Sequence, residues 1–357
     1  MINMLEQLRE RQLQLEGILN ETETAITTFG NDSQAYQAAY NQVILWHNCH
    51  WGLLKLTGND RARFLHNQTT NNINSIKSGQ GCQTVFVNST GRTLELATVY
   101  VTDEAILLLI SPNRRQFLLE WMDKYLFPLD KVEITDISDE NAIFSLIGPE
   151  SDNIIKQWGI NDILGQPQNS HHLVTVDNNV IRVGVGNGLA IPGYTLSIPI
   201  NQVAEVWTKL IELGAIPAGD NVWGKLRIKQ GRPFPDNELT EDYNPLEAGL
   251  WSTISFDKGC YIGQETIARL NTYQGVKQRL WGLKLSQLVE QGTPVTLDEK
   301  KVGILTSCTE INQEFWGLTY VKTKAGGEGL RVIIGEATGE LIAVPFLSHD
   351  YYQPAAM

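Results

Sequence analysis

The sequence predicts an α+β protein that ends in a small all-β domain. Between residues 43 and 276, strand-like runs follow one another across tight turns, and helical runs interrupt them in no regular order. This pattern favours antiparallel sheets with helices over the regular alternation that builds a parallel sheet. After residue 276 the helical periodicity disappears, and short strand-like runs follow at fairly even spacing, which is typical of a barrel or sandwich.

The first 42 residues are expected to form a helical extension. Four leucines lie near heptad spacing: Leu5, Leu8, Leu15 and Leu19. They predict a helix over residues 1–29 that faces solvent or docks on another surface, although Gln12 interrupts the stripe and Gly17 weakens it. The turn residues at 30–33 then cap a second helix.

Residues 43–276 are expected to form one α+β region, and residues 277–350 a β-barrel. The predicted strands of the first region span residues 51–56, 85–87, 94–101, 105–110, 142–147, 180–185 and 194–200. The predicted helices span residues 62–65, 112–126, 149–158, 203–213 and 220–232. Pro112 and Gly214 mark helix ends, and His171–His172 is expected in a solvated loop. The predicted barrel strands span residues 301–307, 315–321, 330–334 and 341–346.

Composition narrows the function classes. A chain of 357 residues predicts two or three domains, and its net charge of −12 argues against broad binding to duplex nucleic acid. The scattered cysteines form no Cys-x-x-Cys pair, which favours a reducing compartment. No signal peptide and no apolar run of membrane-spanning length is visible, so we expect a cytoplasmic protein with no membrane partner.

The run Lys258–Glu265 is the richest candidate for chemistry. It combines a cation, a thiol, two glycines, a phenol, an amide and a carboxylate, a mixture that no apolar core requires. Positive charge from Lys258 and a following helix N-terminus would make Cys260 more reactive. The alternative is that Cys260 is a small buried apolar residue.

Two further charged residues fall among apolar neighbours. Arg227 lies between Leu226 and Ile228 on a helix, so its guanidinium needs an anionic ligand or an internal carboxylate such as Glu247. For Glu247 itself, structural pairing and ligand binding both stay open. A metal site is not expected, because the spacing of His47, Cys49 and His50 matches no zinc pattern.

The run Lys258–Glu265 resembles the signature of the YgfZ family, folate-dependent proteins tied to iron–sulfur cluster maintenance. That family belongs with the glycine-cleavage T-protein (aminomethyltransferase) superfamily. Other segments similar to these proteins follow in the expected order over about residues 45–345: Thr57–Asp60, Gly91-Arg92, Pro192–Tyr194, Leu226-Arg227, Asn244–Glu247 and Val302–Ser307.

The resemblance implies a cloverleaf of two interleaved α+β domains and a C-terminal β-barrel around a central hole that holds tetrahydrofolate. It implies cofactor-binding roles for Arg227, Tyr261, Glu247 and Tyr194. It implies chemical roles for Cys260, Lys258 and Glu95. Where aminomethyltransferases carry an acidic pair, this chain has Glu95 alone, and Thr195 stands where they carry a pterin-binding glutamate.

Three hypotheses follow. The first is a YgfZ-like tetrahydrofolate-binding protein that supports iron–sulfur enzymes or their assembly proteins through Cys260. The second is a folate-dependent aminomethyltransferase that moves a one-carbon unit to tetrahydrofolate with the help of Glu95. The third is a scaffold without a ligand that contacts partner proteins through the N-terminal helix.

Overall fold

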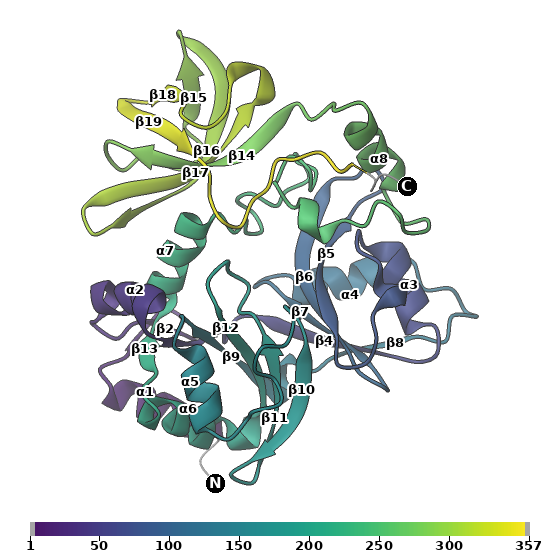
Figure 1. Ribbon diagram of the computed structural model, residues 1–357, viewed down its shortest axis with the longest axis vertical. Coiled ribbons are helices and arrows are strands. Elements are labelled where there is room, and N and C mark those ends of the chain that lie inside the picture. The colour runs from purple at the N-terminus through teal and green to yellow at the C-terminus, as the bar shows by residue number, and fades with distance from the viewer. Residues whose placement is uncertain (1–3, 354–357) are drawn as a thin grey trace. The chain divides into compact units, whose positions relative to one another are not determined.

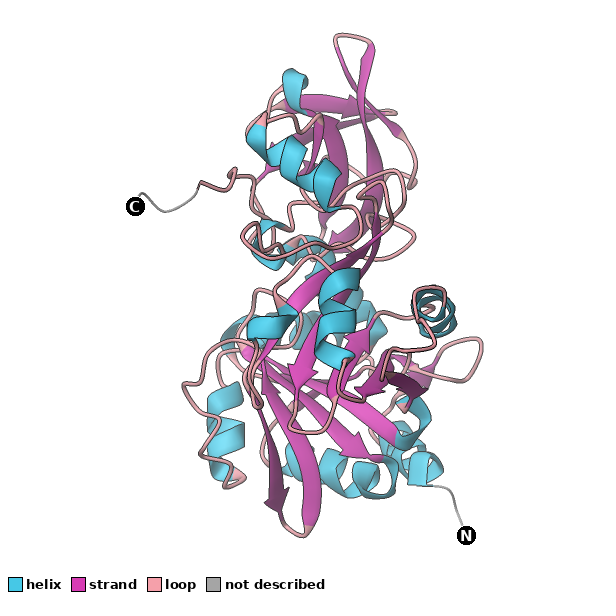
Figure 2. Cartoon of the chain, turned by 90° about the vertical axis from the view of Figure 1, so that its right-hand side faces the viewer, coloured by secondary structure: helices cyan, strands magenta, loops and turns pink. Residues whose placement is uncertain are grey.

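The computed structural model describes residues 4–353, which divide into two compact units (Figure 1). Unit 1 holds the described residues up to Arg61 together with Ile76–Cys82 and Thr98–Gly224. Unit 2 holds Ala62–Ser75, Gln83–Ala97 and the described residues from Lys225 onward. The chain leaves unit 1 and returns to it twice, so the units are interleaved, and both contain strands and helices (Figure 2). The predicted α+β class is confirmed.

A six-stranded sheet forms the centre of unit 1. Its strand order is β10 (His171–Val176), β11 (Asn179–Val185), β12 (Gly193–Pro199), β9 (Asn141–Ile147), β3 (Ile44–His47) and β13 (Ile216–Ala218). Neighbours are antiparallel except β3 and β13, which are parallel. Alternate residues such as Phe144, Leu146 and Leu196 turn to one face of the sheet. There they join one apolar cluster with α5 (Ser151–Gln157) and α6 (Val203–Glu212).

The second sheet has the order β5 (Gly81–Val87), β6 (Thr93–Val101), β7 (Ile106–Ile110), β4 (Gly52–Thr57) and β8 (Glu133–Asp136). β4 pairs antiparallel with both β7 and β8. Three further helices are α2 (Asp32–Asn41), α4 (Arg115–Asp123) and α7 (Asp220–Gln230). Short 3₁₀ turns occupy Ser138–Glu140 and Ile200–Gln202.

The N-terminal segment differs from the predicted single helix. α1 (Met4–Gln14) ends early, and β1 (Ile18–Leu19) pairs with β2 (Ile26–Thr28). The helix stops because Glu16 adopts a left-handed φ of 64° and the N–H of Gly17 turns back to the carbonyl of Gln12. α1 is also not a free extension, because Leu8 is 1% exposed and the Arg11 guanidinium donates to the Ala204 carbonyl of α6 at 2.5 Å.

His171 lies in strand β10 rather than in the predicted solvated loop. A two-residue turn at Asp177-Asn178, with φ of 48° and 63°, joins β10 to β11. His171 is 2% exposed, and its Nε2 lies 2.9 Å from the Val101 carbonyl. Arg182 donates to its Nδ1 at 2.8 Å, so Nδ1 carries no proton. Asp177 and Asn178 are residues that favour such turns, so the sequence contained a signal for this hairpin.

This geometry predicts a stability that depends on pH. Burial, and then repulsion from Arg182, lower the pKa of His171 from 6.5 to about 4. The unfolded chain binds a proton below pH 6.5 and the folded chain only below about pH 4, so stability falls as the pH drops through this window. At pH 5 the loss from this group is expected to be about 2 kcal/mol.

Urea unfolding of the full chain at pH 7.5 and pH 5 measures this loss. His171→Gln is expected to remove its own share of about 2 kcal/mol and to leave the share of other buried histidines such as His47, whereas the neighbouring His172→Gln should keep the full pH dependence. An identical pH dependence in both variants would refute the assignment to His171.

Unit 2 ends in a closed six-stranded barrel, as predicted. Around the barrel the order is β14 (Gln278–Leu285), β17 (Glu314–Lys322), β16 (Lys300–Ile311), β15 (Pro294–Leu297), β18 (Arg331–Ile334) and β19 (Ala337–Ile342). Its core includes Leu283, Val295, Leu305 and Leu341. Unit 2 also contains α8 (Gln264–Thr272) and all of α3 (Arg61–Gln68) except Arg61, which belongs to unit 1. Short 3₁₀ turns occupy Ile73–Ser75, Trp251–Thr253 and Thr323–Ala325. Within residues 4–353, no helix combines the length and apolar character needed to cross a bilayer.

Candidate functional site

The side chain of Lys258 anchors the signature loop to the end of α3. Its Nζ donates to the carbonyls of His66 and Thr69 at 2.6 Å and to that of Asn71 at 2.7 Å. An ammonium has three N–H donors, so these contacts account for all of them. The side chain is buried, and its charge lowers the pKa of His66 in addition to the larger effect of that residue's own burial.

Cys260 is exposed, while Lys258 and Tyr261 of the same loop are buried. Tyr261 is buried, its ring lies 4.6 Å from the Lys258 ammonium, and burial raises the pKa of its hydroxyl. The exposure of Cys260 excludes the alternative that it is a small buried apolar residue. The loop therefore presents one thiol to its surroundings from a fixed base.

The second glycine of the signature packs against the β5–β6 turn. Gly263 precedes α8 with a left-handed φ of 78°, and a Cβ there would lie 2.5 Å from the Asn88 carbonyl oxygen and 2.8 Å from the Gly91 Cα. By contrast, a Cβ on Gly259 would meet only the His66 ring, at 3.8 Å. The two glycines thus have different requirements: Gly263 needs the space and the backbone freedom of glycine, and Gly259 does not.

Substituting these glycines is expected to have unequal effects. Gly263→Ala should lower the free energy of unfolding by about 2–4 kcal/mol, because it adds both a strained φ and a backbone clash. Gly259→Ala should change it by less than about 1 kcal/mol. Thermal or urea unfolding of the two variants measures the difference. Equal losses of stability would show that Gly263 is not required for close packing against the β5–β6 turn.

Arg227 is buried in an ion pair with Glu238 of the following loop. The guanidinium donates to Glu238 Oε2 at 3.0 Å and to the Ser307 hydroxyl at 2.8 Å, and Ser307 donates to Glu238 Oε1 at 2.6 Å. The Tyr320 hydroxyl completes the cluster by donating to the Glu238 carbonyl. Sequence analysis left open an anionic ligand or an internal carboxylate such as Glu247, and the carboxylate that pairs with Arg227 is Glu238.

Glu95 of β6 is fully buried and lies within electrostatic reach of Arg232. Burial lowers the pKa of Arg232 to about 10, while attraction to Glu95 opposes this shift. Arg232 also donates to the Pro233 carbonyl at 3.2 Å. A buried carboxylate beside a buried guanidinium is costly unless it is paired or used, so this is a candidate centre for chemistry.

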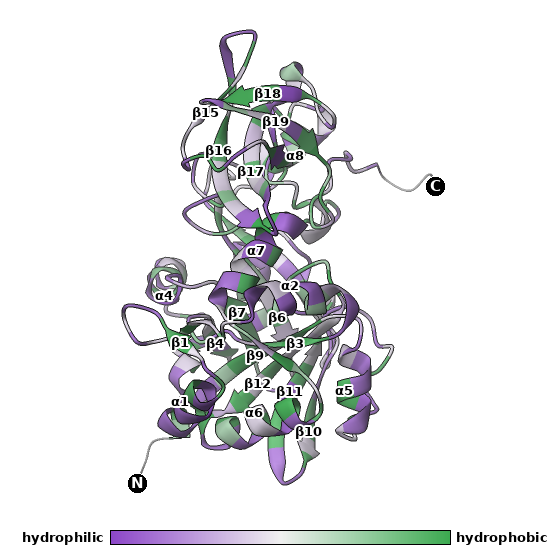
Figure 3. Cartoon of the chain, turned by 90° about the vertical axis from the view of Figure 1, so that its left-hand side faces the viewer, coloured by the Kyte–Doolittle hydropathy of each residue, from purple (hydrophilic) through white to green (hydrophobic). Residues whose placement is uncertain are grey.

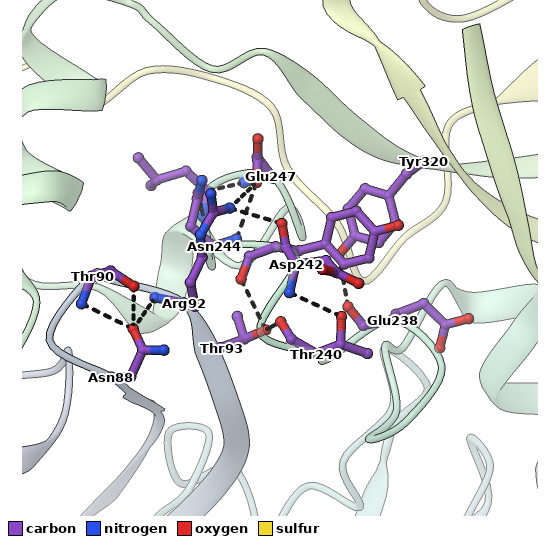
Figure 4. A network of polar contacts seen from close by, with 12 residues as sticks. Asn88, Thr90, Arg92, Thr93, Glu238, Thr240, Asp242, Asn244, Glu247 and Tyr320 are labelled. Carbon is purple, nitrogen blue, oxygen red and sulfur yellow. Dashed lines mark hydrogen bonds and ion pairs between the residues drawn. The ribbon is translucent and has the colours of Figure 1, made fainter. Parts of the chain in front are cut away.

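A polar network joins residues 238–247 to the β5–β6 turn (Figure 4). Glu247 lies 3.4 Å from the Arg92 guanidinium and accepts the Asn244 N–H, and burial raises its pKa. The Arg92 guanidinium also donates to the Asp242 carbonyl at 2.8 Å, and the Thr93 hydroxyl donates to the Thr240 carbonyl. Glu247 is therefore structurally paired within unit 2.

The predicted residues fall in both units. Six of them belong to unit 2: Glu95, Arg227, Glu247, Lys258, Cys260 and Tyr261. Tyr194 belongs to unit 1, where its hydroxyl donates to Asp152 at 2.6 Å and burial raises its pKa. Thr195 is also in unit 1, and its hydroxyl donates to the Gly186 carbonyl. The roles of all these residues in binding or chemistry remain predictions.

Sequence reasoning missed Glu238, which completes the charge balance around Arg227. Its signal was weak, because it stands in an irregular loop with no apolar periodicity around it. Among the described residues, no three His, Cys, Asp or Glu side chains are grouped so that they could hold a metal ion. Burial lowers the pKa of His47 to about 3 and raises that of Cys49 to about 12.

Comparisons with known proteins agree with this architecture. The chain is 45% identical over 329 residues to an Arabidopsis thaliana protein named "Putative transferase At1g60990, chloroplastic", covering 91% of this chain and 76% of that protein. It is 27% identical over 333 residues to an aminomethyltransferase of Halalkalibacterium halodurans, covering 88% of each. The fold matches the glycine cleavage system aminomethyltransferase T from Bartonella henselae with a TM-score of 0.83 at 16% identity, covering 97% of this chain and 99% of that one.

Residues 26–258 match the family model described as the GCVT N-terminal domain. This match spans more than half of the chain and ends within the signature, at Lys258. Together with the relatives named aminomethyltransferases, it indicates the glycine-cleavage T-protein superfamily. The chain therefore belongs to the GCVT N-terminal domain family.

Proposed function

We propose that this chain is a tetrahydrofolate-dependent transferase of the aminomethyltransferase type. The observation that carries the proposal is the buried Glu95 within electrostatic reach of the buried Arg232, in a chain whose relatives include proteins named aminomethyltransferases. Tetrahydrofolate, when bound, supplies two amine nitrogens that accept the methylene carbon of an aminomethyl thioether, with ammonia and a thiol released.

The chemistry of the side chains in unit 2 fits this cofactor. Glu95 would accept the proton that an attacking amine nitrogen loses, and Arg232 offsets the cost of burying that negative charge. Arg227 and Tyr261 are our proposed binding residues in this unit. The fit is incomplete at Thr195, whose hydroxyl already donates to the Gly186 carbonyl and cannot replace a carboxylate at a pterin edge.

The test is a transfer assay with an aminomethyl donor and tetrahydrofolate, in which methylenetetrahydrofolate is measured. Glu95→Gln keeps the shape of the side chain and should lower the rate by about 10²–10⁴-fold, the range of a general acid or base. Glu104→Gln, on an exposed residue, is the matched control. No turnover by the parent chain with any such donor, or full activity of Glu95→Gln, would reject the proposal.

A second candidate function rests on a different observation, the exposed Cys260 on its anchored loop. A YgfZ-like protein that supports iron–sulfur enzymes would use this thiol. Cells that lack the protein should then regain iron–sulfur enzyme activity with the parent chain and with Cys82→Ala, but not with Cys260→Ala. If Cys260→Ala rescues fully while Glu95→Gln does not, the transferase is the remaining candidate.

A further inference from the structure

Arg182 of β11 is a half-buried cation without a carboxylate partner. Its neighbours along the strand, Ile181 and Val183, join the apolar cluster of unit 1, so Arg182 projects from the opposite face of the sheet. Figure 3 shows β11 between β10 and β12. The guanidinium donates through Nη1 to Nδ1 of His171 at 2.8 Å, and it forms no ion pair with a described Asp or Glu side chain.

No charge within the chain compensates this guanidinium. Burial lowers the pKa of Arg182, and the attraction that opposes this shift comes from Tyr100. Burial raises the pKa of Tyr100 to about 12, so the phenol is neutral at pH 7. For Arg115, burial also acts, but hydrogen bonds and attraction from Asp136 and Asp139 outweigh it and raise the pKa. A half-buried cation without such partners is costly, so Arg182 is suited to an anion from outside the chain.

Arg182 lines a cavity of about 510 Å³ that lies wholly within unit 1. Ser170, which is 8% exposed, lines the same cavity. Neither its hydroxyl nor Nε and Nη2 of Arg182 forms a hydrogen bond with a described residue, and none of these atoms is sealed from solvent. Further polar side chains complete the lining: Ser78, Gln80, Thr102 and Gln166.

The ring of His171 holds the guanidinium in place. Its Nε2 donates to the Val101 carbonyl at 2.9 Å, and the ring packs edge-on against Tyr100 with centroids 5.1 Å apart. A Cβ on Gly184, which pairs with His171 across the two strands, would lie 3.0 Å from the Tyr100 ring, so glycine provides the space for this packing. The donors of Arg182 are therefore positioned before any ligand arrives, which lowers the entropy cost of binding.

Asp103 is the one carboxylate in the lining, and it is exposed. Water solvates an exposed carboxylate well, so Asp103 needs no counter-ion, whereas the half-buried Arg182 does. The negative charge of Asp103 repels a ligand with two negative charges more than a ligand with one. The cavity thus favours a single negative charge at Arg182.

We propose that this cavity binds a small monocarboxylate with a polar body, such as a hydroxy acid. The carboxylate would accept hydrogen bonds from the guanidinium of Arg182 and the hydroxyl of Ser170, and a planar carboxylate matches the two-pronged geometry of a guanidinium. The body would contact the amides of Gln80 and Gln166. No residue proposed for the transfer reaction lines this cavity, so the inference does not depend on the proposed function.

Lactate has these features and serves as the probe. Calorimetric titration of the full chain at low salt should give saturable binding with a Kd of about 1 mM, a reasonable value for about six non-hydrogen atoms. Lactamide has nearly the same shape without the charge and should bind at least about tenfold more weakly. Asp103→Asn removes a repulsive charge and should tighten lactate binding about two- to fivefold.

Arg182→Gln removes the charge and should weaken lactate binding by at least about tenfold. Ser170→Ala removes one hydroxyl, leaves the contact between Arg182 and His171 intact, and should weaken binding about three- to tenfold, so it tests the site even if Arg182→Gln unfolds. Arg331→Gln makes the same change of net charge at an exposed residue of unit 2 and should leave the affinity unaltered. No saturable binding of lactate, equal affinity for lactamide, or an unchanged affinity in Ser170→Ala would overturn the proposal.

Discussion

Lys258→Met is expected to lower the free energy of unfolding by about 3–5 kcal/mol. Methionine retains most of the apolar stem but has no N–H group. The carbonyls of His66, Thr69 and Asn71 would then lose the donor that they share, and each buried acceptor left unpaired costs about 1–3 kcal/mol before relaxation. Urea unfolding, followed by circular dichroism, measures the loss.

An exposed lysine of the same unit provides the control. Lys300→Met should leave the unfolding midpoint nearly unchanged, because its side chain is exposed at the start of β16. If Lys258 acts instead as an activating charge for Cys260, the variant would keep its stability and its thiol would react more slowly with iodoacetamide. That pair of results would contradict the structural role and favour the chemical one.

Glu238→Gln should also cost about 3–5 kcal/mol, because it leaves the buried guanidinium of Arg227 without its counter-charge. The two side chains are 8% and 0% exposed and lie 3.0 Å apart. Coulomb attraction is strong at such a site, and so is the penalty for an uncompensated charge. The measurement is again the free energy of unfolding of the variant and the parent chain.

A double-mutant cycle separates the pair from its surroundings. Adding Arg227→Met to Glu238→Gln should recover much of the lost stability, since the uncompensated charge is removed with it. The exposed pair Lys284–Glu314, whose atoms are also 3.0 Å apart, is the matched control, and Glu314→Gln should have little effect. Additive losses in the Arg227–Glu238 cycle would show that the two groups do not depend on each other.

The sequence predicted the fold well where local periodicity agrees with burial. Strands β9 and β12 and the end of α6 at Gly214 all lie within a residue or two of the expected positions, because their apolar alternation and stop signals are strong. The barrel strands β16 and β17 were also found. The eight-residue strand β14 and the four-residue strand β15, by contrast, were missed.

The site was harder to predict, because its pairings depend on distant parts of the chain. The Lys258 ammonium contacts the carbonyl groups of residues that stand about 190 positions earlier in the sequence. The spacing of residue types cannot predict a contact with a backbone oxygen. For Arg227 the need for a buried partner followed from its apolar neighbours, but the choice between Glu238 and Glu247 required the fold. The leucine spacing predicted too long a helix at α1, because it gives no sign of the left-handed conformation of Glu16 that ends the helix.

The interleaving of the two units affects how the protein is made on the ribosome. Synthesis runs from the N-terminus, so the residues of unit 1 have all been added once Gly224 is in place. The stretches Ala62–Ser75 and Gln83–Ala97 must then wait for the last third of the chain, although they carry apolar side chains such as Leu65 and Phe86 that end up fully buried. During that delay these two stretches are the sites where nascent chains would aggregate or recruit a chaperone.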